Sequence, residues 1–147
     1  MTLALPATRA AIALLIPHQG AMCLLERVMA CDADSIACES DTHRDFANPL
    51  RRDGILPMVC GLEYALQAMA LHGALTTGGV AQKPGYLSAL RGVRIGAARL
   101  DTVAGALRIA ATLVAAEARG FIYRFEIIGA ADALLSGQAT IIIPEAP

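Results

Sequence analysis

Residues 56–75 read LPMVCGLEYALQAMALHGAL, a long run of apolar helix formers that holds one carboxylate, Glu63. Pro57 stands at the start of the run, and two glycines follow Thr77. Proline near the start and glycine after the end are the asymmetry expected of a helix. We therefore expect a helix over residues 57–77. Because this helix is apolar on nearly every side, other elements must cover it all round.

The segments on both sides of this helix have the composition of β-strands. Before it, MCLLERVMAC (22–31) and the alternating SIACESDT (35–42) flank the turn DAD, which indicates a hairpin. After it, four segments read as strands joined in a meander: GYLSALRGVRIG (85–96), AGALRIAATLVAAEA (104–118), GFIYRFEIIG (120–129) and ALLSGQATIII (133–143). We expect an α+β protein in which an antiparallel sheet of five to six strands wraps around one long central helix, the hot-dog fold.

Composition limits the classes of partner. The 147 residues suit a single domain, 1–147, with one core. A net charge of -1 at pH 7 gives no general attraction to nucleic acid or anionic membranes, and we expect neither as a partner. Only 17% of the residues are charged and 56% are hydrophobic, which favours a homodimer or a hetero-oligomer.

The N-terminal run AAIALLIP (10–17) is too short for a membrane span, and neither a basic region nor a cleavage motif accompanies it. We expect a short packed helix at about residues 8–15 and a cytoplasmic protein. Cys23, Cys31, Cys38 and Cys60 form no C-x-x-C pair and have no histidine at metal-binding spacing. We expect free, buried thiols and no metal site.

Glu63 is the main candidate for chemistry. A carboxylate removed from water is poised to give or take a proton, because burial disfavours its charged form. Gln67 lies one helical turn further on, while Leu62, Leu66 and Met69 define the opposite, apolar side. The alternative is that Glu63 and Gln67 form a solvated or interface stripe.

The three histidines differ in setting. His18 follows a proline in the otherwise apolar IPHQGAM, and a histidine is a natural proton carrier near neutral pH. His18 could equally cap a helix end, or lie in the core with its hydrogen bonds satisfied. His43, in DTHRDF, has polar neighbours, and we expect it in a solvated loop. His72 follows the apolar helix, and we expect it to pack structurally.

The loop NPLRRDGILP (48–57) leads to the start of the helix. The unpaired amides there, around Met58 to Gly61, together with the helix dipole, are able to polarise a carbonyl oxygen. Gly61 also permits a ligand to approach the backbone closely. Arg51 and Arg52 either meet a phosphate or an acidic partner, or form a solvated pair.

Two motifs resemble those of a known family. PHQGAMCLLERV (17–28) resembles the opening motif of hot-dog 3-hydroxyacyl-acyl-carrier-protein dehydratases, which run Leu-Pro-His-Arg, then apolar residues, then Asp-Arg-Val. LPMVCGLEYALQAMA (56–70) resembles their helix motif, in which an acid precedes an Ala-Gln pair. Together with NPLRRDG and GYLSALRGVRI, the pattern is most similar to the dehydratase-like subfamily found with aryl-polyene-type biosynthesis, over residues 12–143.

The resemblance implies a site. Glu63 and Gln67 fall where the family has its acid and its glutamine, but Asn48 stands in the loop where typical members carry the catalytic histidine, and Met58 replaces a glycine. Either His18 takes over as base, or the activity is altered or lost. Glu63 would then protonate the departing hydroxyl, and Gln67 would orient Glu63 or complete a contact across the dimer.

The resemblance also implies partners. The substrate would be an acyl thioester carried on the phosphopantetheine of an acyl carrier protein, with no other cofactor. Asn48, Met58, Cys60, Gly61 and Gln67 would bind it. Arginines at strand or loop edges (Arg51, Arg52, Arg91 or Arg94) would touch the phosphate or the carrier. Two alternatives remain: a non-catalytic hot-dog partner of an active dehydratase, and an acyl-thioesterase in which Glu63 activates water.

Overall fold

The apolar run at residues 56–75 forms the central helix. In the computed structural model, which describes residues 4–144, helix α2 spans Gly61–Thr76 and follows a 3-10 turn, η3 (Met58–Cys60). The helix thus begins four residues later than the expected 57, because the chain after Pro57 first takes the tighter turn. Nine of the sixteen residues of α2 are buried, since the sheet covers most of its surface.

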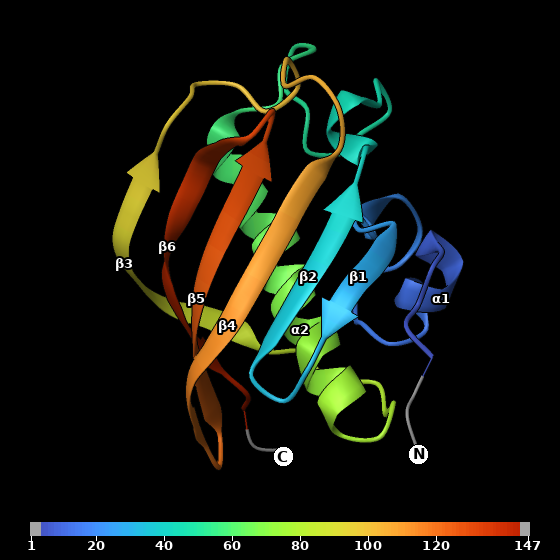
Figure 1. The fold of residues 1–147 in the computed structure, drawn as a ribbon, viewed down its shortest axis with the longest axis vertical. Helices are drawn as coiled ribbons and strands as arrows, with labels where there is room; N and C mark the ends of the chain where they lie inside the picture. Colours follow the sequence, from blue (N-terminus) through green and yellow to red (C-terminus); the bar gives the residue numbers. More distant parts are fainter. Residues whose placement is uncertain (1–3, 145–147) are drawn as a thin grey trace.

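Six antiparallel strands form one sheet that curls around α2 (Figure 1). In chain order they are β1 (Arg27–Cys31), β2 (Ser35–Ser40), β3 (Tyr86–Ile95), β4 (Leu107–Glu117), β5 (Gly120–Gly129) and β6 (Asp132–Ile142). The α+β hot-dog architecture expected from the sequence is confirmed.

The order of the strands corrects one expectation. The four strands after α2 do not form a simple meander, because β4 pairs with β2 and β3 lies at the far edge beside β6, in the order β1-β2-β4-β5-β6-β3. The segment between β3 and β4 therefore crosses one end of the sheet (Figure 1). As a result β3 has a neighbour on one side only.

The core lies between α2 and the concave face of the sheet. Tyr64 and Leu71 on α2 are fully buried, and Ile109, Phe125 and Ile127 face them from the sheet. Alternation on β4 and β5 sends these apolar residues inward and arginines outward. Each fully buried large apolar side chain contributes about 1.5–3 kcal/mol through removal from water.

The N-terminal segment packs beside the sheet. Helix α1 (Arg9–Ala13) is shorter than the expected 8–15 and is capped by the Thr8 hydroxyl, which accepts from the Ala11 amide at 3.1 Å. The guanidinium of Arg9 donates to the Cys23 carbonyl at 2.6 Å and so closes the loop that contains His18. Among residues 4–144, no helix has both the length and the apolar character needed to cross a membrane.

Candidate functional site

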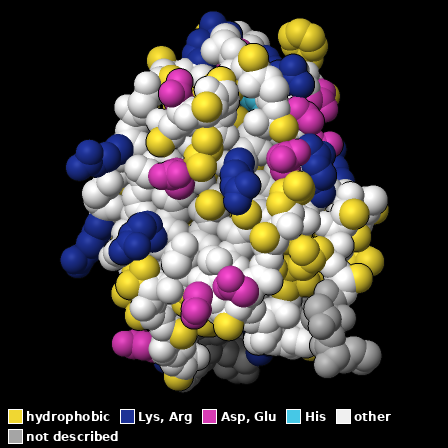
Figure 2. Space-filling model, in the orientation of Figure 1, with side chains coloured by type: hydrophobic (Ala, Val, Ile, Leu, Met, Phe, Trp, Pro, Cys, Tyr) yellow, Lys and Arg dark blue, Asp and Glu magenta, His cyan; other side chains and the backbone are white. Residues whose placement is uncertain are grey.

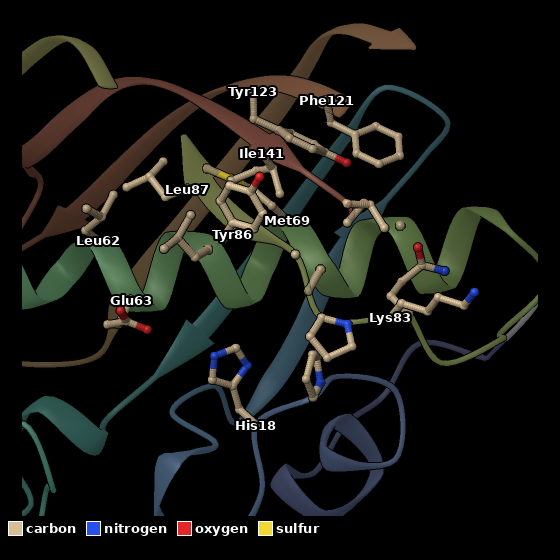
Figure 3. A pocket seen from close by; sticks show the side chains of 18 residues that line it. His18, Leu62, Glu63, Met69, Lys83, Tyr86, Leu87, Phe121, Tyr123 and Ile141 are labelled. Carbon is tan, nitrogen blue, oxygen red and sulfur yellow. The ribbon is translucent and has the colours of Figure 1, made fainter. Parts of the chain in front are cut away.

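A pocket of about 390 Å³ runs along α2 beneath the sheet (Figure 3). It lies between one side of the helix, the ends of β5 and β6 and the chain that leads into β3. Its walls are mainly apolar, and its polar side chains are few. The lining consists of Pro17, His18, Leu62, Glu63, Leu66, Met69, Ala70, Gly73, Gln82, Lys83, Pro84, Gly85, Tyr86, Leu87, Phe121, Tyr123, Ile141 and Ile143.

Glu63 projects into this pocket from the first turn of α2. Its side chain is half-buried, and within the described part of the chain it forms no hydrogen bond or ion pair. The first turn suits a carboxylate, because the helix dipole is positive there. Glu63 is therefore held by the helix while its oxygens stay available to a ligand.

His18 lines the same pocket, from the loop after α1. Figure 3 shows His18 and Glu63 on the same side of α2. The Nδ1 atom of His18 is buried and has no hydrogen-bond partner among residues 4–144. A buried polar atom without a partner is uncommon and costly, so it marks a place where a ligand or water completes the hydrogen bonding. The structure thus brings together the acid and the base candidates.

The side chains of α2 that point toward the pocket differ from those expected from the sequence. Leu62, Leu66 and Met69 do not lie opposite Glu63, since all four line the pocket. The glutamine, by contrast, points away from it: Gln67 is fully buried, accepts from the Leu24 amide at 2.9 Å and donates to the Met22 carbonyl at 2.7 Å. Gln67 does not contact Glu63; it fastens α2 to the segment between the His18 loop and β1.

Three of the helix-start amides, those of Met58, Cys60 and Gly61, are already occupied. The Met58 amide donates to the Ala98 carbonyl and the Cys60 amide to the Pro57 carbonyl, both at 3.0 Å. The Gly61 amide donates to carbonyls within η3. A Cβ at Gly61 would come within 3.0 Å of the Leu135 side chain, so this glycine allows the sheet, rather than a ligand, to pack closely against the helix start. The expected carbonyl-polarising site is therefore not formed by these three amides.

Asn48 lies outside this pocket, in a buried polar network. Its amide donates to the Thr42 carbonyl at 2.9 Å and to the Tyr64 hydroxyl at 3.0 Å. That hydroxyl is also 2.8 Å from the Thr42 hydroxyl. Burial raises the pKa of Tyr64, so the phenol stays a donor. Asn48 thus holds its loop in place and does not line the pocket.

The same loop corrects the expectation for His43. This side chain is fully buried rather than solvated, and its Nε2 lies 2.9 Å from the Val103 carbonyl. Arg51 is also part of this structure: its side chain is 9% exposed and donates to the carbonyls of Asp45, Gly54 and His43. The loop is therefore built on internal contacts, and Arg51 is not free for a phosphate.

The cysteines are free, as expected: Cys23 and Cys38 are buried, and Cys31 and Cys60 are half-buried. Burial raises the pKa of Cys60, which keeps its thiol protonated, and Cys60 does not line the pocket. Among the residues that the structure describes, no group of three or more His, Cys, Asp or Glu side chains is placed to hold a metal ion.

Several pocket residues were not singled out from the sequence. Lys83, Tyr86 and Phe121 line the pocket, as does Tyr123, whose hydroxyl contacts His72. Phe121 and Tyr123 are two residues apart in the expected strand at 120–129, and this spacing is the signal that could have placed them on one face. The approach of Lys83 and Tyr86 to the helix carries no local signal, because it depends on the position of β3 at the edge of the sheet beside β6.

Comparisons with known proteins agree with this architecture. A family model described as "ApeP-like: ApeP dehydratase" matches residues 10–147. A chain of the dehydratase heterocomplex ApeI:P from Xenorhabdus doucetiae is similar in structure, with a TM-score of 0.78, 23% identity and 91% of each chain covered. No match was found among the curated proteins.

More distant solved structures share the fold. AziG of S. sahachiroi has a TM-score of 0.57 and 16% identity over 81% of this chain and 90% of its own. The thioesterase HI1161 of Haemophilus influenzae has a TM-score of 0.56 and 14% identity over 79% of this chain and 76% of its own. The hot-dog fold therefore serves more than one activity among these neighbours.

Proposed function

Since the chain belongs to the ApeP-like dehydratase family, we propose that it removes water from a 3-hydroxyacyl thioester carried by an acyl carrier protein. One observation carries the proposal: Glu63 and His18 line one pocket, and both have hydrogen-bonding capacity that the described residues do not use. A general acid and a general base beside one mainly apolar channel are what a β-elimination needs.

In the proposed reaction a neutral His18 takes the proton from the α-carbon of the substrate. The electron pair of that C–H bond forms the double bond between the α- and β-carbons, and the bond from the β-carbon to the hydroxyl oxygen breaks. Glu63 in its acid form gives a proton to the departing oxygen, which leaves as water. The proton then returns from His18 to Glu63 through solvent. Each positioned group supplies a factor of about 10²–10⁴.

The remaining pocket residues support the binding of an acyl chain. Leu66, Met69, Phe121 and Ile141 offer apolar contacts along α2, so the chain is removed from water beside the reacting carbons. The elimination transfers no electrons to or from the protein, so it requires no redox cofactor. In this proposal the substrate arrives on the phosphopantetheine arm of its carrier, in the cytoplasm.

The direct test is Glu63→Gln, which keeps the shape of the side chain and removes the acid. We expect dehydration of a 3-hydroxyacyl thioester to fall by about 10²-fold or more, from the loss of a positioned acid. Glu117→Gln, at an exposed position of β4, is the matched control and should retain activity. Both variants should keep the oligomeric state and unfolding curve of the parent chain. A fully active Glu63→Gln variant would refute the proposal.

A second candidate is a non-catalytic subunit that shapes the site of an active partner. It is favoured by the loop at residues 42–56, where Asn48 and Arg51 make structural contacts and no histidine faces the pocket. ApeI:P is itself a heterocomplex. In this case Glu63→Gln would leave the activity of the assembled complex unchanged. Release of thiol without an enoyl product would instead indicate a thioesterase.

We also propose that a second hot-dog subunit pairs with β3. This edge strand leaves backbone groups unpaired along one side, and Leu90, Val93 and Ile95 on it are 39%, 42% and 58% exposed. Exposed apolar edge strands are templates for pairing with another chain. A partner of this kind would cover these side chains and lengthen the sheet.

A further inference from the structure

The two ends of the pocket along α2 differ in character. Figure 3 shows Glu63 at one end of the lining side chains and Lys83 at the other. On the helix the pocket reaches from Glu63 to Gly73, which are ten residues apart, or about 15 Å along the helix axis. Because the proposed reaction takes place beside Glu63, this length is available to the rest of the acyl chain.

The side chains between the two ends are mainly apolar. Leu66, Met69 and Ala70 line the pocket from α2, and Phe121 and Ile141 line it from the sheet. The opposite, outer face of the sheet carries scattered charged side chains of both signs (Figure 2). An acyl chain that starts beside Glu63 is therefore removed from water when it runs along α2 toward Gly73.

One segment closes the pocket at the Gly73 end. Residues 80–85, here called the closing segment, lie between α2 and β3, and residues 82–85 line the pocket. The backbone amide of Gln82 donates to the Leu15 carbonyl at 3.4 Å, which joins the segment to the chain after α1. A Cβ on Gly85 would come within 2.6 Å of the Ile143 side chain, so the backbone there lies directly against the chain after β6. The closing segment is thus held by two other parts of the molecule.

Gln82 is the residue of the closing segment that meets the helix. Its side chain lies against Gly73, where an added Cβ would come within 3.1 Å of the Gln82 Oε1 atom and 3.3 Å of its Cδ atom. Its Nε2 atom donates to the Thr77 hydroxyl at 3.1 Å and to the Val80 carbonyl at 3.2 Å. The missing side chain at Gly73 gives the amide its room, and the two hydrogen bonds fix it across the end of the apolar channel.

We propose that Gln82 limits the length of the acyl chain that the pocket accepts; this inference rests on the function proposed above. A chain that extends from Glu63 along α2 meets the Gln82 amide at Gly73. A longer chain must break the hydrogen bonds of this amide or leave its last carbons in water. An extended chain advances about 1.2 Å per bond, so the channel suits a chain on the order of ten carbons.

The test is the dependence of turnover on chain length. Thioesters of N-acetylcysteamine with 3-hydroxyhexanoyl, 3-hydroxydecanoyl and 3-hydroxytetradecanoyl groups are compared by kcat/KM. For Gln82→Ala we expect the tetradecanoyl-to-hexanoyl ratio of kcat/KM to rise about tenfold or more, because each further methylene that is buried is worth about fourfold in affinity. Gln82→Asn keeps the amide on a shorter side chain and should give a smaller rise.

Two further variants complete the comparison. Ala70 lines the pocket about one helical turn before Gly73, so Ala70→Leu fills the channel with a residue that a helix accepts well. We expect this variant to lower the same ratio and to favour the hexanoyl thioester. Val80→Ala is the matched control, since Val80 belongs to the closing segment, is 63% exposed and does not line the pocket. A Gln82→Ala variant with the length profile of the parent chain would overturn the inference.

A binding measurement separates this inference from the proposed reaction. Saturated hexanoyl, decanoyl and tetradecanoyl thioesters of N-acetylcysteamine, which have no hydroxyl group to lose, are titrated into the parent chain and into Gln82→Ala. We expect affinity for the parent to stop rising after the decanoyl thioester and affinity for the variant to rise further. This result without any turnover would support the role of Gln82 and count against the dehydratase reaction. Dehydration with the same length dependence in both proteins would overturn the role of Gln82 and leave the proposed reaction standing.

Discussion

The Tyr123 hydroxyl on β5 lies 2.8 Å from Nδ1 of His72 on α2, and Nε2 of His72 lies 2.9 Å from the Asp32 carbonyl oxygen. A carbonyl only accepts, so Nε2 carries the proton and Nδ1 accepts from the phenol. Burial, with a smaller contribution from Cys31, raises the pKa of Tyr123 to about 12, which keeps the donor protonated. The pair joins the central helix to the sheet at the wall of the pocket.

Tyr123→Phe removes this donor and leaves Nδ1 of His72 buried and unpaired. We expect the free energy of unfolding to fall by about 1–3 kcal/mol, the cost of an unsatisfied buried polar group. The measurement is equilibrium unfolding in urea. Tyr86→Phe is the control, since Tyr86 is 55% exposed and should change stability by less than about 0.5 kcal/mol. Equal stability of the two variants would show that the hydrogen bond contributes nothing net.

Because His43 is buried, we expect the protein to lose stability in mild acid. Burial lowers the pKa of His43, and the hydrogen bond to the Val103 carbonyl offsets this only in part; Arg44 and Arg51 lower the pKa further, while Asp41 raises it. The unfolded chain therefore binds a proton more readily than the folded one, and stability falls as pH drops from about 6.5 toward the lower folded pKa. Unfolding free energies at pH 7.5 and 5.5 check this. His43→Gln should lose less stability over that interval, and an identical loss would assign the effect to other groups.

Substitutions of the neighbouring residues Arg51 and Arg52 should differ strongly in their effect on stability. Its guanidinium serves three carbonyls and lies 3.8 Å from Asp101, whereas Arg52 is exposed. We expect Arg51→Ala to lower the free energy of unfolding by about 2–3 kcal/mol, because buried acceptors lose a charged donor. Arg52→Ala should stay within about 0.5 kcal/mol. Thermal unfolding of both variants measures the difference. If Arg51→Ala is as stable as the parent chain, water replaces the guanidinium at no cost in free energy.

Much of the fold was predictable because its signals are local. The ends of β4, β5 and β6 lie within three residues of the segments read from alternation and turns. The position of β3 was not predictable in this way. Whether it pairs with β4 or with β6 depends on how the whole sheet closes around α2, and alternation within a strand does not encode its neighbour.

In the candidate site, too, some features were predictable from the local sequence and others were not. Glu63 was visible as a carboxylate in an apolar helix, but the facing of Gln67 was not, because a helix that is apolar all round has no polar side from which to judge orientation. His43 was expected in solvent from its polar neighbours, yet Val103, sixty residues further on, covers it. Likewise, the meeting of His18 with Glu63 joins segments that share no local pattern.

By itself, the sequence determined the central helix, the strand segments, the acid in the helix and the resemblance to a dehydratase family, since each depends on spacing within a short stretch. The tertiary structure alone decided that Glu63 and His18 share a pocket, that Gln67 and Asn48 are structural, and that Gln82 meets Gly73 at one end of the pocket. These depend on contacts between distant segments, and such contacts are set when the sheet closes around the helix and buries both.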